Sequence, residues 1–253
     1  MTTSKPDFIV PDWPSPAGIR AAFTLRAGGV SAPPFDTFNI AAHVGDDSNA
    51  IAGNRARLRE SLALPAEPVW LEQVHGHRVV DLDSQTSRAS LGPADAAIAR
   101  SPGRVCAIQV ADCMPVLFAA ADGSVIGAAH AGWRGLAGGV LESTARAMKA
   151  PAGDLIAWMG PAIGPAHFEV GEEVRAAFLA ADSGASAAFT ANRRGRWQCD
   201  LYALATRRLA AMGVTAVYGG GWCTYADAAR FFSYRRDGRC GRMAALIWRD
   251  SQG

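Results

Sequence analysis

Three short motifs near the middle of the chain carry side chains that can bind a metal ion or act as a nucleophile and its base. His75 follows an apolar segment, Cys113 lies two residues before a proline, and His130 ends a run of small residues. Two histidines and one cysteine suit a three-ligand zinc site with an open fourth position. The same residue types equally suit a cysteine nucleophile with a histidine base. Residue types alone leave both kinds of chemistry open.

The spacing of the three positions does not decide between these alternatives. The intervals between His75, Cys113 and His130 match no local zinc-knuckle pattern, in which ligands come in closely spaced pairs. His77 would share a face with His75 on a strand, but Gly76 can break that strand and turn the two side chains apart. A structural role also stands as an alternative, because most free cysteines are buried and unreactive.

The segments around these motifs have the composition of a sheet with flanking helices. Short apolar runs separated by Gly, Pro or Asp are typical of strands, and apolar residues at helical spacing predict helices. The cysteine and both histidines lie close to the ends of strand segments, where side chains can be exposed. The predicted strands are residues 19–26, 68–74, 78–82, 95–99, 104–110, 115–120, 124–130, 155–159, 214–218 and 242–248, and the predicted helices are 50–64, 136–149, 171–181 and 200–212.

We therefore expect one mixed α/β domain, of the α+β type, over residues 19–253. The preceding residues, 1–18, are rich in proline and are expected to form an N-terminal extension on the surface. Residues 30–45 form a long irregular stretch, and a loop of that length inside a compact domain often carries function.

The composition fits a globular protein and excludes several other classes. Of the 253 residues, 49% are apolar and 19% charged, which suffices for a sizeable core. No apolar stretch reaches the roughly 20 residues of a membrane span, and residues 1–14 show no secretory signal. A formal net charge of +2 without a basic tail argues against nucleic acid as a partner. Five cysteines, an odd number, predict reduced thiols in the cytoplasm.

The motifs together resemble a known family. The likeness extends from about residue 20 to the C-terminus and is carried by several separate segments. On these segments the chain is similar to the YfiH-type family, which is labelled a laccase domain or polyphenol oxidase. The segments are TLRAGGVS (24–31), FDTFNIAAHVGDD (35–47), QVHG (73–76), ADCMPVLF (111–118), HAGWRG (130–135), GPAIGP (160–165), FEVGEEV (168–174), FFSYRRDG (231–238) and GRMAALIW (241–248).

The resemblance implies a fold, a metal and an activity. The fold would be a sandwich of mixed sheets flanked by helices, similar to the catalytic domain of cytotoxic necrotizing factor toxins. The metal would be zinc, since the family's ligands fall on His75, Cys113 and His130. The implied activities are phosphorolysis of adenosine, inosine, guanosine or methylthioadenosine to free base and ribose 1-phosphate, and deamination of adenosine. Ala226 and His167 stand near positions where relatives often carry cysteine, which puts further thiol chemistry in doubt.

The laccase label conflicts with the histidine count. A multicopper oxidase needs about ten histidines for its copper centres, whereas this chain has five. We therefore expect a single small zinc site, in which copper could act only as a substitute.

Purine nucleosides and phosphate are the partners that the resemblance implies. Phosphorolysis requires cations for the phosphate, and arginine binds phosphate through its planar guanidinium group. Arg26 and Arg134 lie at glycine-rich turns beside matched motifs, so these are the arginines expected at the phosphate. Asn39 and Gln73 are candidate contacts to the sugar or the base on the strength of the resemblance.

Deamination would also require a proton shuttle. Asp112, beside the cysteine ligand, and His43, in the long irregular stretch, are the candidates for that role. His43 is also a candidate contact to the substrate. Four aromatic residues could stack on a purine but suit core packing better: Trp133, Phe231, Phe232 and Tyr234. The C-terminal motif contains a cluster of three further arginines, Arg235, Arg236 and Arg242, which are at least as well suited to pairing with acidic side chains.

Two other classes of function stay open. One is a cysteine-dependent amide hydrolase with Cys113 as nucleophile and His130 as base, acting on peptidoglycan precursors, to whose editing bacterial relatives are linked. The other is a nucleotide- or partner-binding module without turnover. The sequence leaves the oligomeric state open as well.

Overall fold

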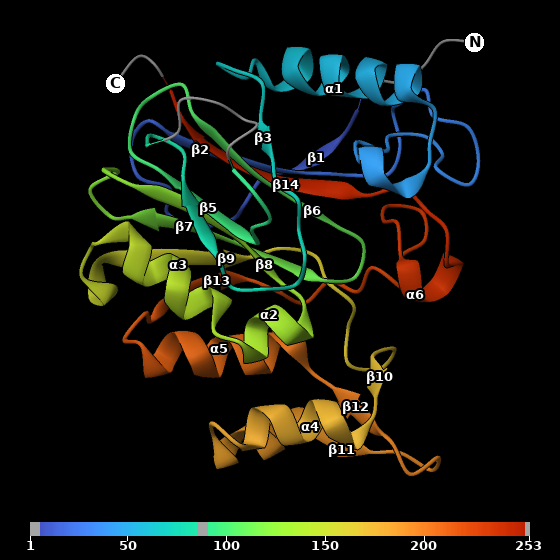
Figure 1. Cartoon of the computed structure of the whole chain (residues 1–253), viewed down its shortest axis with the longest axis vertical. Helices are drawn as coiled ribbons and strands as arrows, with labels where there is room; N and C mark the ends of the chain where they lie inside the picture. Colours follow the sequence, from blue (N-terminus) through green and yellow to red (C-terminus); the bar gives the residue numbers. More distant parts are fainter. Residues whose placement is uncertain (1–5, 85–90, 251–253) are drawn as a thin grey trace.

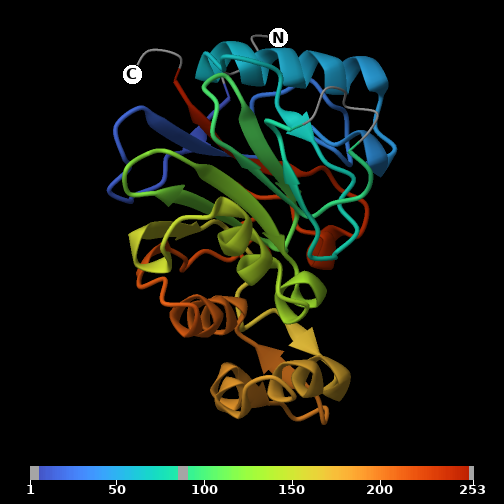
Figure 2. The ribbon, with the colours of Figure 1, turned by 60° about the vertical axis from the view of Figure 1, so that its left-hand side comes forward.

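Two packed sheets with helices on both sides form most of the molecule (Figure 1). The computed structural model describes residues 6–84 and 91–250. A small lobe lies at one end of the molecule, beyond the helical layer (Figure 2). Within the described ranges, no helix is long and apolar enough to cross a membrane. The layers, in order, are α1 (Ser48–Leu62), a five-stranded sheet, a six-stranded sheet, and a helical layer of α2 (Trp133–Ala137), α3 (Val140–Met148) and α5 (Leu201–Ala211).

Both large sheets are mixed, which confirms the expected α+β sandwich with flanking helices. In the five-stranded sheet, β3 and β6 run parallel and the other neighbours antiparallel. Its order is β1 (Phe8–Ile9), β2 (Ile19–Thr24), β14 (Met243–Arg249), β6 (Val105–Val110) and β3 (Val69–Trp70). The order of the six-stranded sheet is β13 (Ala216–Gly219), β9 (Leu155–Met159), β7 (Met114–Ala120), β8 (Ile126–Ala131), β5 (Ala96–Ala99) and β4 (Val79–Asp81).

The central strands are buried on both faces. Every residue of β5, β6, β7, β8 and β9 is buried, and this explains their nearly continuous apolar sequences, since a covered sheet has no face that needs polar residues. Burial of large side chains between the two sheets is the main term that holds them together. That inter-sheet core includes Phe23, Ile108, Leu117, Trp158 and Ile247.

The predicted helix over 136–149 is wrong in one respect, because the structure has two helices there. Gly138 and Gly139 separate α2 from α3, and Gly139 has a φ of +89°, a conformation that favours glycine. The predicted helix over 50–64 begins two residues earlier, since the Asp47 carboxylate accepts the backbone N–H groups of residues 49 and 50 and caps α1.

Part of the predicted N-terminal extension belongs to the sheet. Strand β1 pairs antiparallel with β2, and Trp13 is buried in the inter-sheet core. Apolar side chains therefore fix this proline-rich segment from residue 6 onward, whereas residues 1–5 of the predicted extension lie outside the described residues.

The small lobe was not anticipated as a separate sheet. It consists of α4 (Glu172–Leu179), the turn η4 (Ser183–Ala188) and three antiparallel strands. Its strands have two or three residues each, too few for a periodic pattern to be visible in the sequence. They are β10 (Glu169–Val170), β12 (Trp197–Cys199) and β11 (Phe189–Ala191). Other short elements in the described part of the chain are η1 (Ala42–Val44), η3 (Ala152–Asp154) and α6 (Tyr234–Asp237).

Candidate metal centre and substrate pocket

His75, Cys113 and His130 meet at one end of the two sheets. Their ligand atoms all lie within 4.8 Å of one another, and Cys113 Sγ is 3.8 Å from His75 Nε2. Two ligand atoms of a tetrahedral zinc ion, one nitrogen and one sulfur, are separated by roughly 3.6 Å. In residues 6–84 and 91–250 this is the one group of three histidine, cysteine or acidic side chains close enough to hold a metal ion.

The two sheets contribute different parts of this cluster. His75 follows β3 of the five-stranded sheet, and His130 lies in β8 of the six-stranded sheet. Cys113 lies in the turn that connects β6 of the first sheet to β7 of the second. The sequence placed the three residues at strand ends, and the packing of the sheets brings those ends together.

Asp95 orients both histidines and was not identified from the sequence. Its side chain is fully buried, and the carboxylate accepts the backbone N–H groups of Val74, His75 and Gly76 at 3.2, 2.8 and 2.7 Å. The carboxylate also lies 2.8 Å from His130 Nδ1, which leaves Nε2 of that ring for a metal. A carboxylate behind a histidine ligand fixes the orientation of the ring and raises its basicity.

The electrostatics of the cluster favour charged forms. Burial alone would raise the pKa of the Cys113 thiol, but the charge of His130 and hydrogen bonds with His130 and His75 outweigh burial and hold that pKa well below its usual range. Burial would lower the pKa of His130, but the charge of Cys113 and the hydrogen bond with Asp95 raise it. A thiolate is the form of cysteine that binds metals and attacks electrophiles.

A small residue beside the donor atoms leaves space for an ion. A Cβ atom on Gly132 would lie 2.8 Å from Cys113 Sγ and 3.0 Å from His75 Cδ2. One thiolate and two imidazole donors suit zinc and also copper. The residues present therefore fit a resident metal ion of that type.

A pocket of about 190 Å³ opens beside the cluster. Two arginines and three aromatic residues, Trp133, Phe168 and Tyr234, stand at its wall. The Arg134 guanidinium lies over the Trp133 ring, 4.4 Å from its centroid, and Tyr234 is 61% exposed. Arg235 donates from Nη1 to the carbonyl of Glu169 at 3.0 Å. The lining residues are His75, Ala111, Asp112, Cys113, Trp133, Arg134, Ile163, Phe168, Leu201, Tyr234 and Arg235.

Of the two arginines expected at a phosphate, only Arg134 lines this pocket. Arg26 has an ion pair with Asp36, donates to the carbonyl of Ala228, and lies over the Phe232 ring. The Arg26 guanidinium therefore already interacts with other residues of the protein. The wall of the pocket also contains Arg235, one of the three C-terminal arginines for which the sequence made pairing with acidic side chains at least as suitable a role.

Three other predicted contact residues also lie outside the pocket lining. The Gln73 amide pairs with both backbone groups of Gln109, at 2.8 Å each, and so joins the loop after β3 to β6. Asn39 is fully buried and binds the backbone of Ala41 and of Arg242. His43 lies in η1, where desolvation and the charges of Arg242 and of another arginine lower its pKa.

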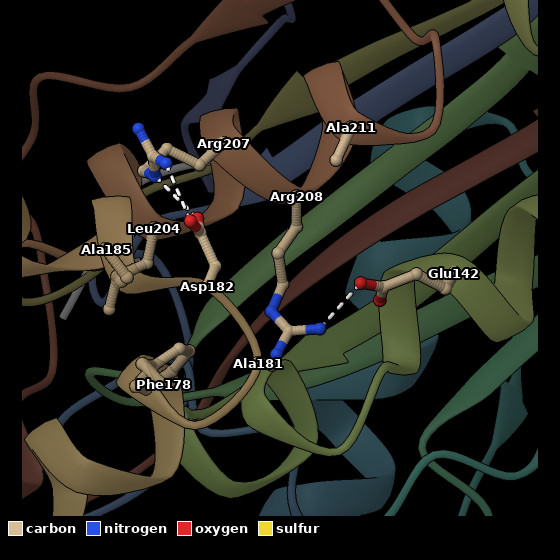
Figure 3. Close-up of a pocket in the computed structure, with 9 residues that line it drawn as sticks. All are labelled: Glu142, Phe178, Ala181, Asp182, Ala185, Leu204, Arg207, Arg208 and Ala211. Carbon is tan, nitrogen blue, oxygen red and sulfur yellow. Dashed lines mark hydrogen bonds and ion pairs between the residues drawn. The ribbon is translucent and has the colours of Figure 1, made fainter.

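A second and larger pocket, of about 490 Å³, lies between α3, α5 and the α4–η4 segment (Figure 3). Its charged side chains pair with one another. Arg207 binds Asp182 through two nitrogens at 2.8 and 2.9 Å, and Arg208 binds Glu142 at 2.6 Å. The figure shows that each pair spans two elements: one pair joins α5 to the small lobe, and the other joins α5 to α3. We interpret these side chains as structural.

Known proteins resemble this chain over nearly its whole length. A family model described as multi-copper polyphenol oxidoreductase laccase matches residues 20–250. A purine nucleoside phosphorylase of Pseudomonas aeruginosa is 52% identical over 243 residues, covering 95% of this chain and 98% of that protein. The purine nucleoside phosphorylase YfiH of Escherichia coli is 50% identical over 240 residues, with the same coverage.

Solved structures share the fold. The crystal structure of a Neisseria meningitidis protein has a TM-score of 0.92 and 43% identity, and the match covers 96% of this chain and 99% of that one. YlmD from Geobacillus stearothermophilus has a TM-score of 0.84 and 34% identity over 93% of each chain.

Proposed function

Because the chain belongs to the multi-copper polyphenol oxidoreductase laccase family, with relatives of about 50% identity named purine nucleoside phosphorylases, we propose that it cleaves purine nucleosides by phosphorolysis. The observation that carries this proposal is the pocket in which Arg134 and Arg235 stand beside the His–Cys–His cluster. Adenosine, inosine, guanosine and methylthioadenosine are the substrates proposed.

Phosphorolysis transfers the ribosyl group from the base to phosphate. A phosphate oxygen forms a bond to C1′ of the ribose while the bond from C1′ to the purine nitrogen breaks, and the base leaves with the electron pair and takes up a proton. The guanidinium groups of Arg134 and Arg235 would bind the phosphate dianion by charge-assisted hydrogen bonds. The exposed ring of Tyr234 offers an aromatic surface for the purine.

We propose zinc as the resident metal, held by His75, Cys113 and His130. When bound, zinc would supply a Lewis acid that polarises an oxygen of the substrate or of water. Copper fits the same three donors as a substitute, but five histidines are too few for the copper centres that the family's description implies. All five cysteines are free thiols, which supports our placement of the protein in the reducing cytoplasm.

A nucleoside assay with and without phosphate tests the proposal. The zinc-loaded protein is incubated with inosine, and free hypoxanthine and ribose 1-phosphate are measured. We expect base release that depends on phosphate and falls by about 100-fold in Arg134→Ala, because a charge-assisted contact to phosphate is lost. Base release that ignores phosphate would contradict phosphorolysis. Adenosine without phosphate serves as the assay for deamination, with inosine as the product.

The paired ionisation of Cys113 and His130 favours one alternative function. A thiolate beside an imidazolium is also the arrangement of a cysteine amide hydrolase, here acting on peptidoglycan precursors. A metal-free protein that iodoacetamide inactivates, that cleaves amide bonds of such precursors and that ignores nucleosides would establish this alternative and refute the nucleosidase.

A further inference from the structure

Asp112 has a backbone conformation and a burial that are unusual for an aspartate in a turn. Its φ is +87°, and it is 8% exposed. Four described residues other than glycine have a positive φ, and two of them, Ala63 and Lys149, end helices. The other two are His75 and Asp112, both in the pocket lining. Uncommon conformations that the surroundings maintain cluster at functional sites.

The side chain of Asp112 binds two segments that are distant in the sequence. The Thr224 hydroxyl donates to Oδ1 at 2.6 Å, and the backbone N–H of Arg235 donates to Oδ2 at 2.6 Å. The backbone carbonyl of Asp112 also accepts the N–H of Ile163 at 2.9 Å. Three separate segments thus converge on the residue that precedes the cysteine ligand.

Those segments form much of the pocket wall. Ile163, Tyr234 and Arg235 all line the pocket, and Thr224 is tied to the first of these segments because its N–H donates to the carbonyl of Ala162. The positions of the Tyr234 ring and the Arg235 guanidinium therefore depend on the backbone that Asp112 holds.

Ordinary helix capping does not account for this contact. Helix α6 has only four residues and its own N-cap, Ser233, whose hydroxyl accepts the N–H of Arg236. The carboxylate of Asp112 satisfies a further N–H of the same helix from a position 123 residues away in the chain. This hydrogen bond joins α6 to the turn that carries Cys113.

We infer that Asp112 is a positioning residue that holds Tyr234 and Arg235 at the pocket beside the His–Cys–His cluster. Both carboxylate oxygens already accept hydrogen bonds, and one donor is a backbone amide, which cannot relay a proton. This assigns Asp112 a role other than the proton shuttle considered from the sequence. The effect on phosphate binding rests on the proposed function, whereas the effect on α6 does not.

Three variants separate positioning from proton transfer. Asp112→Gly removes the carboxylate and accommodates the positive φ. Asp112→Asn keeps an acceptor for the Arg235 N–H and offers its amide to the Thr224 oxygen, but it cannot shuttle protons as a carboxylate does. Thr224→Val removes one of the two tethers without changing a charge beside Cys113. The control is Asp122→Asn, because Asp122 lies in the turn at the opposite end of β7, where it binds the N–H of Ser124.

The readout that does not depend on activity is limited trypsin digestion of the zinc-loaded protein, with cleavage followed after Arg235, Arg236 and Arg239. In Asp112→Gly we expect cleavage there to be about tenfold faster, since local opening becomes more frequent when a tether is lost. Thr224→Val should show a smaller increase, Asp112→Asn should restore most of the protection, and the control should match the parent. Unchanged cleavage in both Asp112→Gly and Thr224→Val would overturn the inference.

Kinetics provide the second readout. In Asp112→Gly we expect the KM for phosphate to rise about tenfold while zinc content is retained, and Asp112→Asn should recover most of that loss. A collapse of kcat in Asp112→Asn with full tryptic protection would identify a proton shuttle and refute positioning. If the parent protein releases no base from inosine, the proposed function fails, and the digestion result alone decides the role of Asp112.

Discussion

The molecule contains two cysteine–histidine pairs at similar distances. Cys113 Sγ lies 3.8 Å from His75 Nε2, and Cys223 Sγ lies 3.5 Å from His167 Nδ1. A glycine packs closely against the cysteine of each pair, Gly132 against Cys113 and Gly164 against Cys223. By distance alone the second pair would be the better candidate for shared chemistry.

The surroundings of the two pairs differ. The first has a third donor in His130, and the buried Asp95 fixes its histidines. In the second, the His167 ring stacks on Tyr225 with centroids 4.5 Å apart, and within the described ranges it belongs to no group of three potential ligands. The candidate metal centre therefore differs from the second pair in its convergent donors and its buried carboxylate, not in its sulfur–nitrogen distance.

Replacing each cysteine gives the largest expected contrast. Cys113→Ala should lose stoichiometric zinc and lower phosphorolysis by at least about 1000-fold, because the charged ligand of a three-ligand site is gone. In Cys223→Ala, the zinc content and the rate of phosphorolysis should each stay within about twofold of the parent protein. Zinc content by elemental analysis and hypoxanthine release measure this, and equal zinc loss in the two variants would remove the distinction between the pairs.

The next contrast concerns the side chains that contact the histidines, Asp95 in the first pair and Tyr225 in the second. Asp95→Asn should weaken zinc binding by about 10–100-fold, since an amide cannot accept every hydrogen bond that this carboxylate accepts. Tyr225→Phe keeps the ring stack on His167 and should leave zinc affinity unchanged. Competition with a chromophoric chelator measures both affinities. An unaltered affinity in Asp95→Asn would show that Asp95 only supports the loop at residues 74–76.

The lowered pKa of Cys113 gives the next expected effect. Because the pKa of Cys113 is lowered, its thiolate should persist as the pH falls below neutrality and disappear only as the pH passes through that lowered pKa. In chelator-treated protein at about pH 6.5 we expect iodoacetamide to modify Cys113 about tenfold faster than a free thiol with a pKa of about 8.5. Zinc should protect Cys113 and leave the labelling of Cys223 unchanged.

Tryptic peptides distinguish these sites. Residues 209–230 contain Cys223 alone, and residues 105–134 contain Cys113 with Cys106. Cys106 is fully buried, and burial raises the pKa of its thiol, so it should stay unmodified. Labelling of Cys113 no faster than the free thiol would contradict the favoured thiolate.

The two glycines give the smallest effects. A Cβ atom on Gly132 would lie 2.8 Å from Cys113 Sγ, whereas on Gly164 it would lie 3.1 Å from Cys223 Cβ. Gly132→Ala should reduce zinc affinity about tenfold by crowding the donors. Gly164→Ala should lower the free energy of unfolding by about 1 kcal/mol through overpacking, with zinc affinity kept. Thermal unfolding with and without chelator measures both, and equal zinc affinities in the two variants would contradict the contrast.

The three residues of the candidate metal cluster could be named because each lies in a short motif that resembles the YfiH-type family, whereas spacing alone left a zinc site and a cysteine nucleophile open. Asp95 could not, since it directly precedes β5 with nothing in its neighbours to mark it, and its role arises when the loop at 74–76 folds over it. Strands β6 to β9 were predicted because both of their faces are buried and their sequences are continuously apolar. The likeness to the toxin catalytic domain stays a prediction.

The arginines show why substrate contacts are harder to predict than ligands. Arg26 and Arg134 both lie in matched glycine-rich motifs, and nothing in the adjacent sequence separates them. The Arg26 guanidinium donates hydrogen bonds to the Asp36 carboxylate and the Ala228 carbonyl, 10 and 202 residues away in the chain. Arg235 reaches the pocket because Asp112, 123 residues earlier, binds its backbone. Such long-range partners decide which guanidinium faces a ligand.

The turn between β6 and β7 passes from one sheet to the other and carries Cys113. A metal held there together with His75 and His130 would act as a cross-link between the two layers of the sandwich. Its binding free energy would then add to the stability of the assembled pair of sheets, since the separated layers lack a complete site. Loss of the metal should therefore loosen the contact between the layers before it disturbs the strands within them.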